Sequence, residues 1–255
     1  MSETGPDSIP QTESGPEVVS VPDVAPDVGH LPFGERTALM RRYAELLRTR
    51  GIERGLIGPR EADRIWDRHI LNCARIQELV PEGVEVADIG SGAGLPGLVL
   101  AIARPDLRVH LVEPLLRRST WLSEVVEELD LSGTVVTRCR AEELHGRYQA
   151  DVVTARAVAA LGQLAEWCLP LVRPGGSLLA LKGDRAAEEL DAALPVLDRH
   201  GVSESAVHEL GALGEGSATV VRIVRATGTL TGSSGRDAGR ARRPGRESRR
   251  RPRTR

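Results

Sequence analysis

After Pro81 the sequence alternates short runs rich in β-branched residues with longer helical stretches. This alternation predicts strands at 84–89, 108–113, 134–139, 151–155, 177–181 and 218–224, with helices near 96–103, 115–129, 161–171 and 185–199. Strands separated by helices pair in a mostly parallel sheet, and the helices cover both of its faces. The chain is therefore predicted to have an α/β fold that binds ligands at the carboxyl ends of its strands.

Two further helical stretches precede this alternation. Apolar residues recur on one face of 35–50, and a second apolar face runs through 61–80, between Pro59 and Pro81. We expect a helical extension over 34–82 and an α/β core over 83–226. Together they make one domain of ordinary size.

Charge is distributed unevenly along the chain. Residues 1–30 are proline-rich and carry six acidic residues without any Lys or Arg, whereas 226–255 carry ten arginines against two acidic residues. The part between them holds 24 basic and 28 acidic residues, a net charge of −4. Neither end has enough large apolar residues to offset the entropy lost on ordering. We therefore predict an acidic disordered tail at 1–33 and an arginine-rich disordered tail at 227–255.

The sequence argues against several classes of protein. The longest apolar run, 95–103, is too short to cross a bilayer, and no secretory signal is visible at the N-terminus. Cys73, Cys139 and Cys168 lie far apart without a CxxC pair, which disfavours a zinc site or a disulfide framework. We expect a cytoplasmic monomer with buried, reduced cysteines, no metal and no membrane partner.

A glycine-rich segment follows the first predicted strand, where residues 88–97 read DIGSGAGLPG. Its glycines allow a tight turn and a close approach of the backbone to a ligand, so we predict a cofactor loop. Residues 92–97 match GxGxxG, and Glu113 follows at about the distance expected of a ribose-binding acid. A nicotinamide dinucleotide is therefore one candidate cofactor.

The position of Asp88 favours a different cofactor. A carboxylate at the tip of the strand would repel a pyrophosphate, whereas it would attract the ammonium and sulfonium groups of S-adenosylmethionine. Glu113 can accept hydrogen bonds from the ribose hydroxyls of either cofactor. The residues of the loop therefore favour S-adenosylmethionine.

Two later strand ends bear on the methyl acceptor. Arg156 follows the fourth predicted strand, where methyl group and acceptor would meet, although an ordinary surface ion pair would also explain it. Lys182, the only lysine of the chain, ends the fifth. The Asn/Asp-Pro-Pro-aromatic motif used on adenine amines is absent, and neither Cys139 nor Cys168 is well placed as a nucleophile for cytosine. Guanine N7 already has a free lone pair, so orientation alone can promote its methylation.

Five segments, taken together, resemble the ribosomal RNA small subunit methyltransferase G family, also called glucose-inhibited division protein B. These segments are 68–71 (RHIL), 88–97 (DIGSGAGLPG), 140–143 (RAEE), 155–157 (ARA) and 180–183 (ALKG), and the resemblance covers about 35–225. It implies a Rossmann-like class I methyltransferase with a seven-stranded, mostly parallel sheet, helices on both faces and an N-terminal helical extension. It also implies methylation of guanine N7 in the decoding-region loop of 16S rRNA, using S-adenosylmethionine by direct in-line transfer without a covalent intermediate.

The resemblance further implies roles for single residues. Arg68 and His69 would lie near the RNA, and Arg156 and Lys182 would position the acceptor. The cofactor contacts that the resemblance implies are Gly90, Leu95, Glu113, Ala141, Glu142 and Arg156, to which the chemistry of the loop adds Asp88, Gly92 and Gly94.

Two other functions remain open at this point. An NAD-dependent oxidoreductase would account for the GxGxxG match, and a non-catalytic rRNA-binding assembly factor would account for the fold and the basic tail. In the favoured function the partner is 16S rRNA or the small ribosomal subunit. Arginines at 236–255 would then add nonspecific phosphate contacts that weaken as salt rises.

Overall fold

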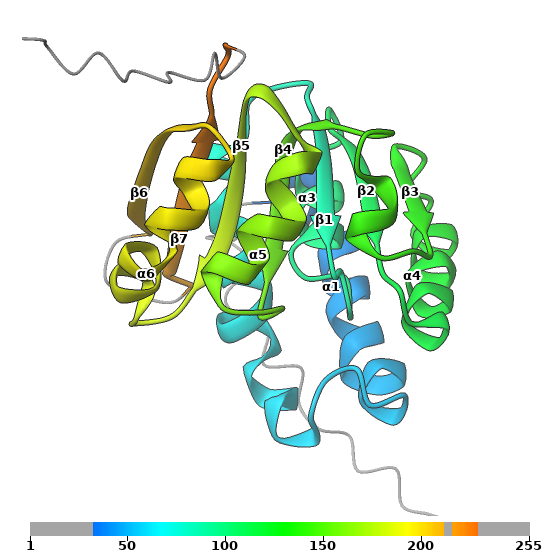
Figure 1. Ribbon diagram of the computed structural model, residues 1–255. Coiled ribbons are helices and arrows are strands. Elements are labelled where there is room, and N and C mark those ends of the chain that lie inside the picture. The colour runs from blue at the N-terminus through cyan, green and yellow to red at the C-terminus, as the bar shows by residue number, and fades with distance from the viewer. Residues whose placement is uncertain (1–32, 212–215, 229–255) are drawn as a thin grey trace, which may run out of the picture.

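The computed structural model describes residues 33–211 and 216–228 (Figure 1). The two predicted tails therefore lie almost wholly outside the described residues. Phe33, which was placed at the end of the first tail, is buried in the core at 4% exposure. The described part consists of a central sheet, helices on both of its faces, and a helical extension at the N-terminal side (Figure 1).

The sheet has seven strands in the order β3-β2-β1-β4-β5-β7-β6. β1 to β5 pair in parallel, whereas β7 runs antiparallel to both β5 and β6. This arrangement confirms the predicted Rossmann-like, mostly parallel sheet. The strands are β1 (Glu85–Ile89), β2 (Arg108–Val112), β3 (Thr134–Thr137), β4 (Ala150–Arg156), β5 (Val172–Lys182), β6 (Val202–Leu210) and β7 (Ala218–Arg225).

Six of these strands coincide with the runs predicted from hydrophobic pattern, whereas the pattern missed β6. β6 lies at one edge of the sheet, and of its nine residues only Leu210 is buried. A strand that packs so little surface carries few of the β-branched residues by which buried strands are found. The seventh strand was expected only from the family resemblance.

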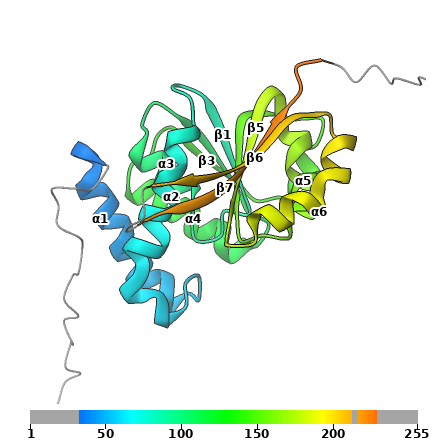
Figure 2. The same cartoon turned by 90° about the vertical axis from the view of Figure 1, so that its left-hand side faces the viewer.

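Each face of the sheet carries its own hydrophobic core. On one face, α3 (Gly97–Ala103) and α4 (Leu116–Glu128) pack with the helical extension. On the other face, α5 (Leu161–Cys168) and α6 (Ala186–Arg199) pack together with the short helical turns Ala141–Leu144 and Leu169–Leu171. Figure 2 shows the sheet nearly edge-on, with these two helical layers on opposite sides.

The helical extension is made of two runs, as predicted. Its buried side chains, which include Met40, Tyr43 and Ile70, continue the core that contains α3 and α4. The extension is thus part of the same folded unit as the sheet. It comprises Gly34–Arg36, α1 (Thr37–Leu46) and Leu47–Gly51 in the first run, and Pro59–Arg64, Ile65–Leu71, α2 (Asn72–Ala74) and Arg75–Leu79 in the second.

The described part of the chain holds no helix that is long and apolar enough to cross a membrane. All three cysteines are free, with Cys73 and Cys168 buried and Cys139 partly exposed. The expectation of buried cysteines therefore holds for two of the three.

Candidate active site

A cavity of about 930 Å³ opens at the carboxyl ends of β1 to β4. Its walls come from the glycine loop after β1, the start of α4, the turn Ala141–Leu144 and the helical extension. This is the edge of the sheet at which the sequence predicted a ligand site. Seven of the predicted cofactor residues line the cavity: Gly90, Gly92, Leu95, Glu113, Ala141, Glu142 and Arg156.

The glycine loop turns beneath this cavity, and its glycines serve two purposes. Gly92 (φ +58°) lines the cavity and places its backbone N–H against Glu113. Gly94 (φ +105°) faces the protein instead, where a Cβ would lie 2.2 Å from Leu98 Cδ1 and 2.9 Å from the Tyr43 hydroxyl. Only glycine combines this positive φ with such a close approach.

Glu113 is a buried carboxylate that lines the cavity at 1% exposure. Its Oε2 accepts a hydrogen bond from Gly92 N at 2.9 Å, and its Oε1 accepts one from Leu115 N at 3.0 Å. The Arg118 guanidinium lies 4.0 Å away. A carboxylate offers about four lone-pair sites, so about two remain for hydroxyl donors in the cavity.

Asp88 is also buried, but it lies behind the loop and does not line the cavity. Its Oδ2 accepts a hydrogen bond from Gly97 N at the start of α3, and its Oδ1 accepts one from Thr154 Oγ1, each at 3.1 Å. Burial raises the pKa of this carboxyl to about 6, although its hydrogen bonds act to lower the pKa. Asp88 therefore joins β1 to β4 and to the start of α3 through these two hydrogen bonds.

Arg156 lies at the opposite wall, at the end of β4. Its guanidinium contacts the Cys73 sulfur at 2.9 Å, the Arg68 carbonyl at 3.3 Å and His69 Nδ1 at 2.7 Å. These partners all belong to the helical extension. Arg156 therefore joins the sheet to the extension at the cavity wall, and three of its five N–H donors are engaged.

His69 continues this chain of contacts toward Glu61. Because the Arg156 guanidinium can only donate, His69 Nδ1 must accept and Nε2 carries the proton that faces Glu61 Oε2 at 3.0 Å. Burial lowers the pKa of His69, and the neighbouring Arg156 charge lowers it further. Both His69 and Glu61 line the cavity, whereas Arg68 lies outside it and pairs with Glu61 at 3.1 Å.

A second cavity of about 540 Å³ adjoins the first across the segment 156–158, which lines both. Arg68, Asn72 and Lys182 also line this second cavity. Ala157 has a φ of +53°, a left-handed conformation that is costly for a residue with a Cβ. The fourth predicted strand end therefore divides two adjoining spaces, one toward the glycine loop and one toward β5.

Lys182 has an anchored ammonium group, although its side chain reaches the second cavity. Its Nζ donates to the Ala159 carbonyl and to Glu189 Oε2, at 2.8 Å each, and the side chain is 9% exposed. Glu189 also accepts a hydrogen bond from Leu161 N at the start of α5. These contacts tie the loop after β4 to α6.

The pattern of the sequence did not indicate several residues of this site. Thr154 contacts Asp88 across the sheet, and Glu61 contacts Arg68 and His69 along a helical run. The spacing of Glu61, seven and eight residues before these two partners, could have suggested its position.

Positive charge around the opening of the first cavity is another feature that the sequence pattern did not indicate. Arg138 and Arg140 line the cavity, are exposed and form no ion pair within the described residues. Three further exposed arginines without an ion pair in the described part of the chain lie on segments 58–64 and 114–118, which also contribute to the lining: Arg60, Arg64 and Arg117.

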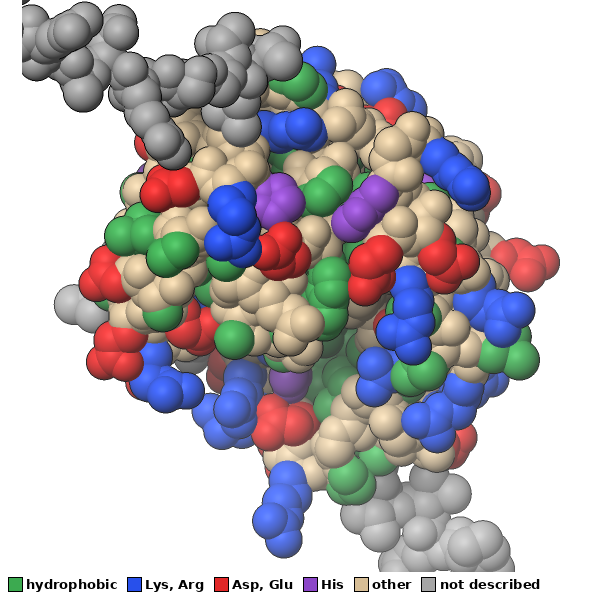
Figure 3. Space-filling model, in the orientation of Figure 1, with side chains coloured by type: hydrophobic (Ala, Val, Ile, Leu, Met, Phe, Trp, Pro, Cys, Tyr) green, Lys and Arg blue, Asp and Glu red, His purple; other side chains and the backbone are tan. Residues whose placement is uncertain are grey.

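Figure 3 shows basic side chains gathered on the side of the molecule that carries α4 and the ends of β2 and β3. The exposed side chains of Leu115 and Leu116 lie on the same segment, at the start of α4. Within the described ranges, no group of three or more His, Cys, Asp or Glu side chains is arranged to hold a metal ion.

Comparison with known proteins identifies the family. The model of the family "rRNA small subunit methyltransferase G" matches residues 36–215. The protein named ribosomal RNA small subunit methyltransferase G from Thermobifida fusca is 51% identical over 223 residues, which cover 87% of this chain and 94% of the relative. The protein of the same name from Salinispora tropica is 56% identical over 201 residues, covering 76% and 83%.

Among solved structures, a putative transferase from Pyrococcus horikoshii is similar with a TM-score of 0.49 and 15% identity, over 61% of this chain and 63% of that one. The family match covers the extension, the glycine loop and both cavities. This chain belongs to the rRNA small subunit methyltransferase G family.

Proposed function

We propose that this chain uses S-adenosylmethionine to methylate N7 of a guanine in the decoding-region loop of 16S rRNA, acting as a cytoplasmic monomer. The observation that carries the proposal is the pair of adjoining cavities that share Arg156, Ala157 and Val158. A cofactor in the first and a nucleotide in the second would meet beside this segment, so the methyl group could reach the base directly. Membership of a family named for rRNA methylation supports the same reaction.

The residues around the first cavity fit S-adenosylmethionine. The free lone pairs of Glu113 suit the ribose hydroxyls, and the turn that begins at Ala141 and Glu142 offers backbone and side-chain contacts to the adenine. The buried carboxylate of Asp88 disfavours a pyrophosphate, which would carry negative charge to the same edge of the sheet. This is the physical reason for ranking the oxidoreductase second.

When bound, S-adenosylmethionine supplies an electrophilic methyl group, and guanine N7 can accept it because its lone pair is free and no proton has to leave. The chain must therefore orient the base and keep it close, without a general base. Arg156 has two N–H donors beyond its three contacts, which suit the guanine O6 or a flanking phosphate. Arg68 and the neutral His69 hold Arg156 in this direction.

The unpaired arginines around the mouth support an RNA substrate. A polyanion gains from phosphate contacts with Arg60, Arg64 and Arg117, and the exposed Leu115 and Leu116 offer apolar surface to unstacked bases. The arginine-rich tail lies outside the described residues, and its proposed part in capturing the particle is tested by deleting 227–255. Unchanged particle affinity and an unchanged salt slope after deletion would reject that part alone.

The proposal is tested by methyl transfer. Purified protein is incubated with labelled S-adenosylmethionine and small ribosomal subunits from a strain that lacks the gene, and the digested RNA is analysed by mass spectrometry. New 7-methylguanosine at one site is the expected product. Particle binding without methyl transfer would support the assembly factor, and cofactor binding without product would indicate another acceptor. Thermal protection by NAD but not by S-adenosylmethionine would support the oxidoreductase.

A further inference from the structure

The carbonyl of Ala93, in the middle of the glycine loop, accepts two hydrogen bonds, from side chains on two different helices. The Tyr43 hydroxyl donates to it at 3.1 Å, and Trp121 Nε1 donates to it at 2.9 Å. Tyr43 belongs to α1 of the helical extension, whereas Trp121 belongs to α4. Both side chains are fully buried, so water cannot replace either donor.

This double contact bears directly on the cavity. Gly92, Ala93 and Leu95 all line it, and Gly92 N is bonded to Glu113 on its other side. A loop with three glycines of positive φ can adopt many other backbone conformations when no contact restrains it. The contacts to Ala93 restrict those alternatives on the side that faces away from the ligand.

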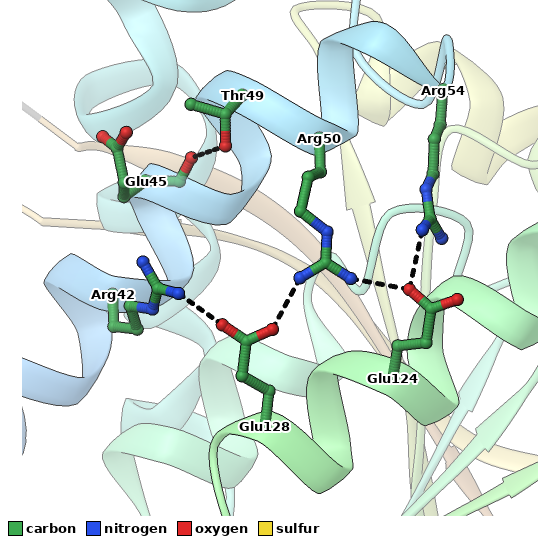
Figure 4. Close-up of polar contacts among 7 residues, drawn as sticks. All are labelled: Arg42, Glu45, Thr49, Arg50, Arg54, Glu124 and Glu128. Carbon is green, nitrogen blue, oxygen red and sulfur yellow. Dashed lines mark hydrogen bonds and ion pairs between the residues drawn. The ribbon is translucent and has the colours of Figure 1, made fainter.

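The extension is in turn fastened to α4 above Trp121. Arg50 pairs with both Glu124 and Glu128, at 2.6 Å each, while Arg54 pairs with Glu124 at 2.8 Å (Figure 4). Arg42 pairs with Glu128 as well. The guanidinium carbons of Arg50 and Arg54 both lie 5.8 Å from the centre of the Trp121 ring. The same indole that holds the loop is thus covered by the extension.

We propose that Tyr43 and Trp121 are positioning residues for the cofactor: by fixing the Ala93 carbonyl they keep the glycine loop ready to bind, and they make the helical extension a part of the cofactor site. The inference rests on the proposed function, since it takes S-adenosylmethionine as the ligand. Neither residue lines the cavity, so each acts through the loop. A loop that holds its binding conformation only part of the time binds more weakly by that fraction.

Calorimetric titration with S-adenosylmethionine tests this in the full chain. We expect Tyr43→Phe and Trp121→Phe each to raise the dissociation constant roughly three- to tenfold, the effect of one lost hydrogen bond. The double variant leaves the buried carbonyl without a donor, so its loss should exceed the product of the two single losses. The matched control is Tyr148→Phe, because the other tyrosine of the chain packs against His110 and does not line the cavity.

A second readout separates positioning from general destabilisation. Hydrogen exchange of residues 37–51 should slow when S-adenosylmethionine is added to the wild type, because linkage is reciprocal, and should slow less in Tyr43→Phe. Equal affinity of wild type and all variants would overturn the inference while leaving the proposed function standing. Failure of the wild type itself to bind S-adenosylmethionine would reject the proposed function instead.

Discussion

The two sides of the site are built from different materials. The cofactor side, by which we mean the first cavity proposed for S-adenosylmethionine, uses backbone: glycines with positive φ, and N–H groups that donate to two buried carboxylates. The acceptor side, by which we mean the second cavity proposed for the nucleotide, uses cationic side chains, and Arg156 and Lys182 are both held by partners on other elements. A site made of backbone groups is lost when a substitution prevents the backbone from adopting the required conformation. A site made of side chains can lose one group while the protein keeps its fold. The contrast leads us to expect different results from substitution on each side.

The largest effect is expected from Gly97→Ala, on the cofactor side. A Cβ there would lie 2.3 Å from Leu111 Cδ2 and 2.6 Å from Asp88 Oδ2, in a fully buried place. We expect the free energy of unfolding to fall by about 3 kcal/mol, measured by urea denaturation. Gly183→Ala is the matched control on the acceptor side, since a Cβ there meets nothing within 4 Å. Equal stability of the two variants would contradict the comparison.

Arg156→Ala should have the opposite character, with a large loss of activity and a retained fold. Removing the guanidinium takes away the donors that would face the acceptor in the proposed function, and we expect methyl transfer to slow roughly 100-fold. Circular dichroism should be unchanged. Arg199→Ala removes an exposed arginine that pairs with Glu166 and serves as the control. Wild-type turnover in Arg156→Ala would remove this residue from the site.

Asp88→Asn tests the charge that is buried on the cofactor side. Burial raises the pKa of Asp88 to about 6, above its ordinary 3.8, so the folded state holds the proton more tightly than the unfolded state. The contribution of the Asp88 carboxyl to the free energy of unfolding is then fully present below pH 3.8 and is lost as the pH rises through 6. An asparagine can still accept from Gly97 N and donate to Thr154, without the cost of a charge.

The free energy of unfolding of Asp88→Asn minus that of the wild type should therefore increase by about 2 kcal/mol from pH 4.5 to pH 7. Urea denaturation at both pH values gives this difference. A constant difference would mean that the carboxyl titrates normally. Calorimetry on the same variant shows separately whether the Asp88 charge contributes to binding S-adenosylmethionine.

The sequence indicated residues on both sides of the site, but it did not indicate the contacts that hold Arg156 and Lys182 in place, for a physical reason. Glycines and an acid at strand ends are local signals, so Gly90, Gly92 and Glu113 were expected to lie at this edge before their geometry was known. The partners of Arg156 are set by how the extension packs on the sheet, which no local pattern records. The same holds for Tyr43 and Trp121, whose shared contact joins segments that are 78 residues apart. The edge strand β6 escaped prediction because it buries so little.

The smallest effect, and the sharpest test of the acceptor side, is expected from Lys182→Met. The Lys182 ammonium donates to the Ala159 carbonyl, and its hydrogen bond to Glu189 lowers the pKa of that carboxyl, which is therefore ionised at neutral pH. Losing it should cost about 1 kcal/mol of stability, because Glu189 keeps the Leu161 N–H and remains partly exposed. Glu189→Gln should cost less, since an amide can still accept both hydrogen bonds.

Steady-state kinetics then separates an anchor from a group that touches the acceptor. If Lys182 only anchors the loop, Lys182→Met and Glu189→Gln should impair methyl transfer in proportion to their losses of stability. If the ammonium also contacts the RNA, Lys182→Met should raise the KM for the ribosomal particle well beyond the effect of Glu189→Gln. The first result would make Lys182 a structural anchor that joins the loop after β4 to α6 beside the second cavity. The second would place a second cation beside Arg156, and the acceptor side would then hold the phosphate as well as the base.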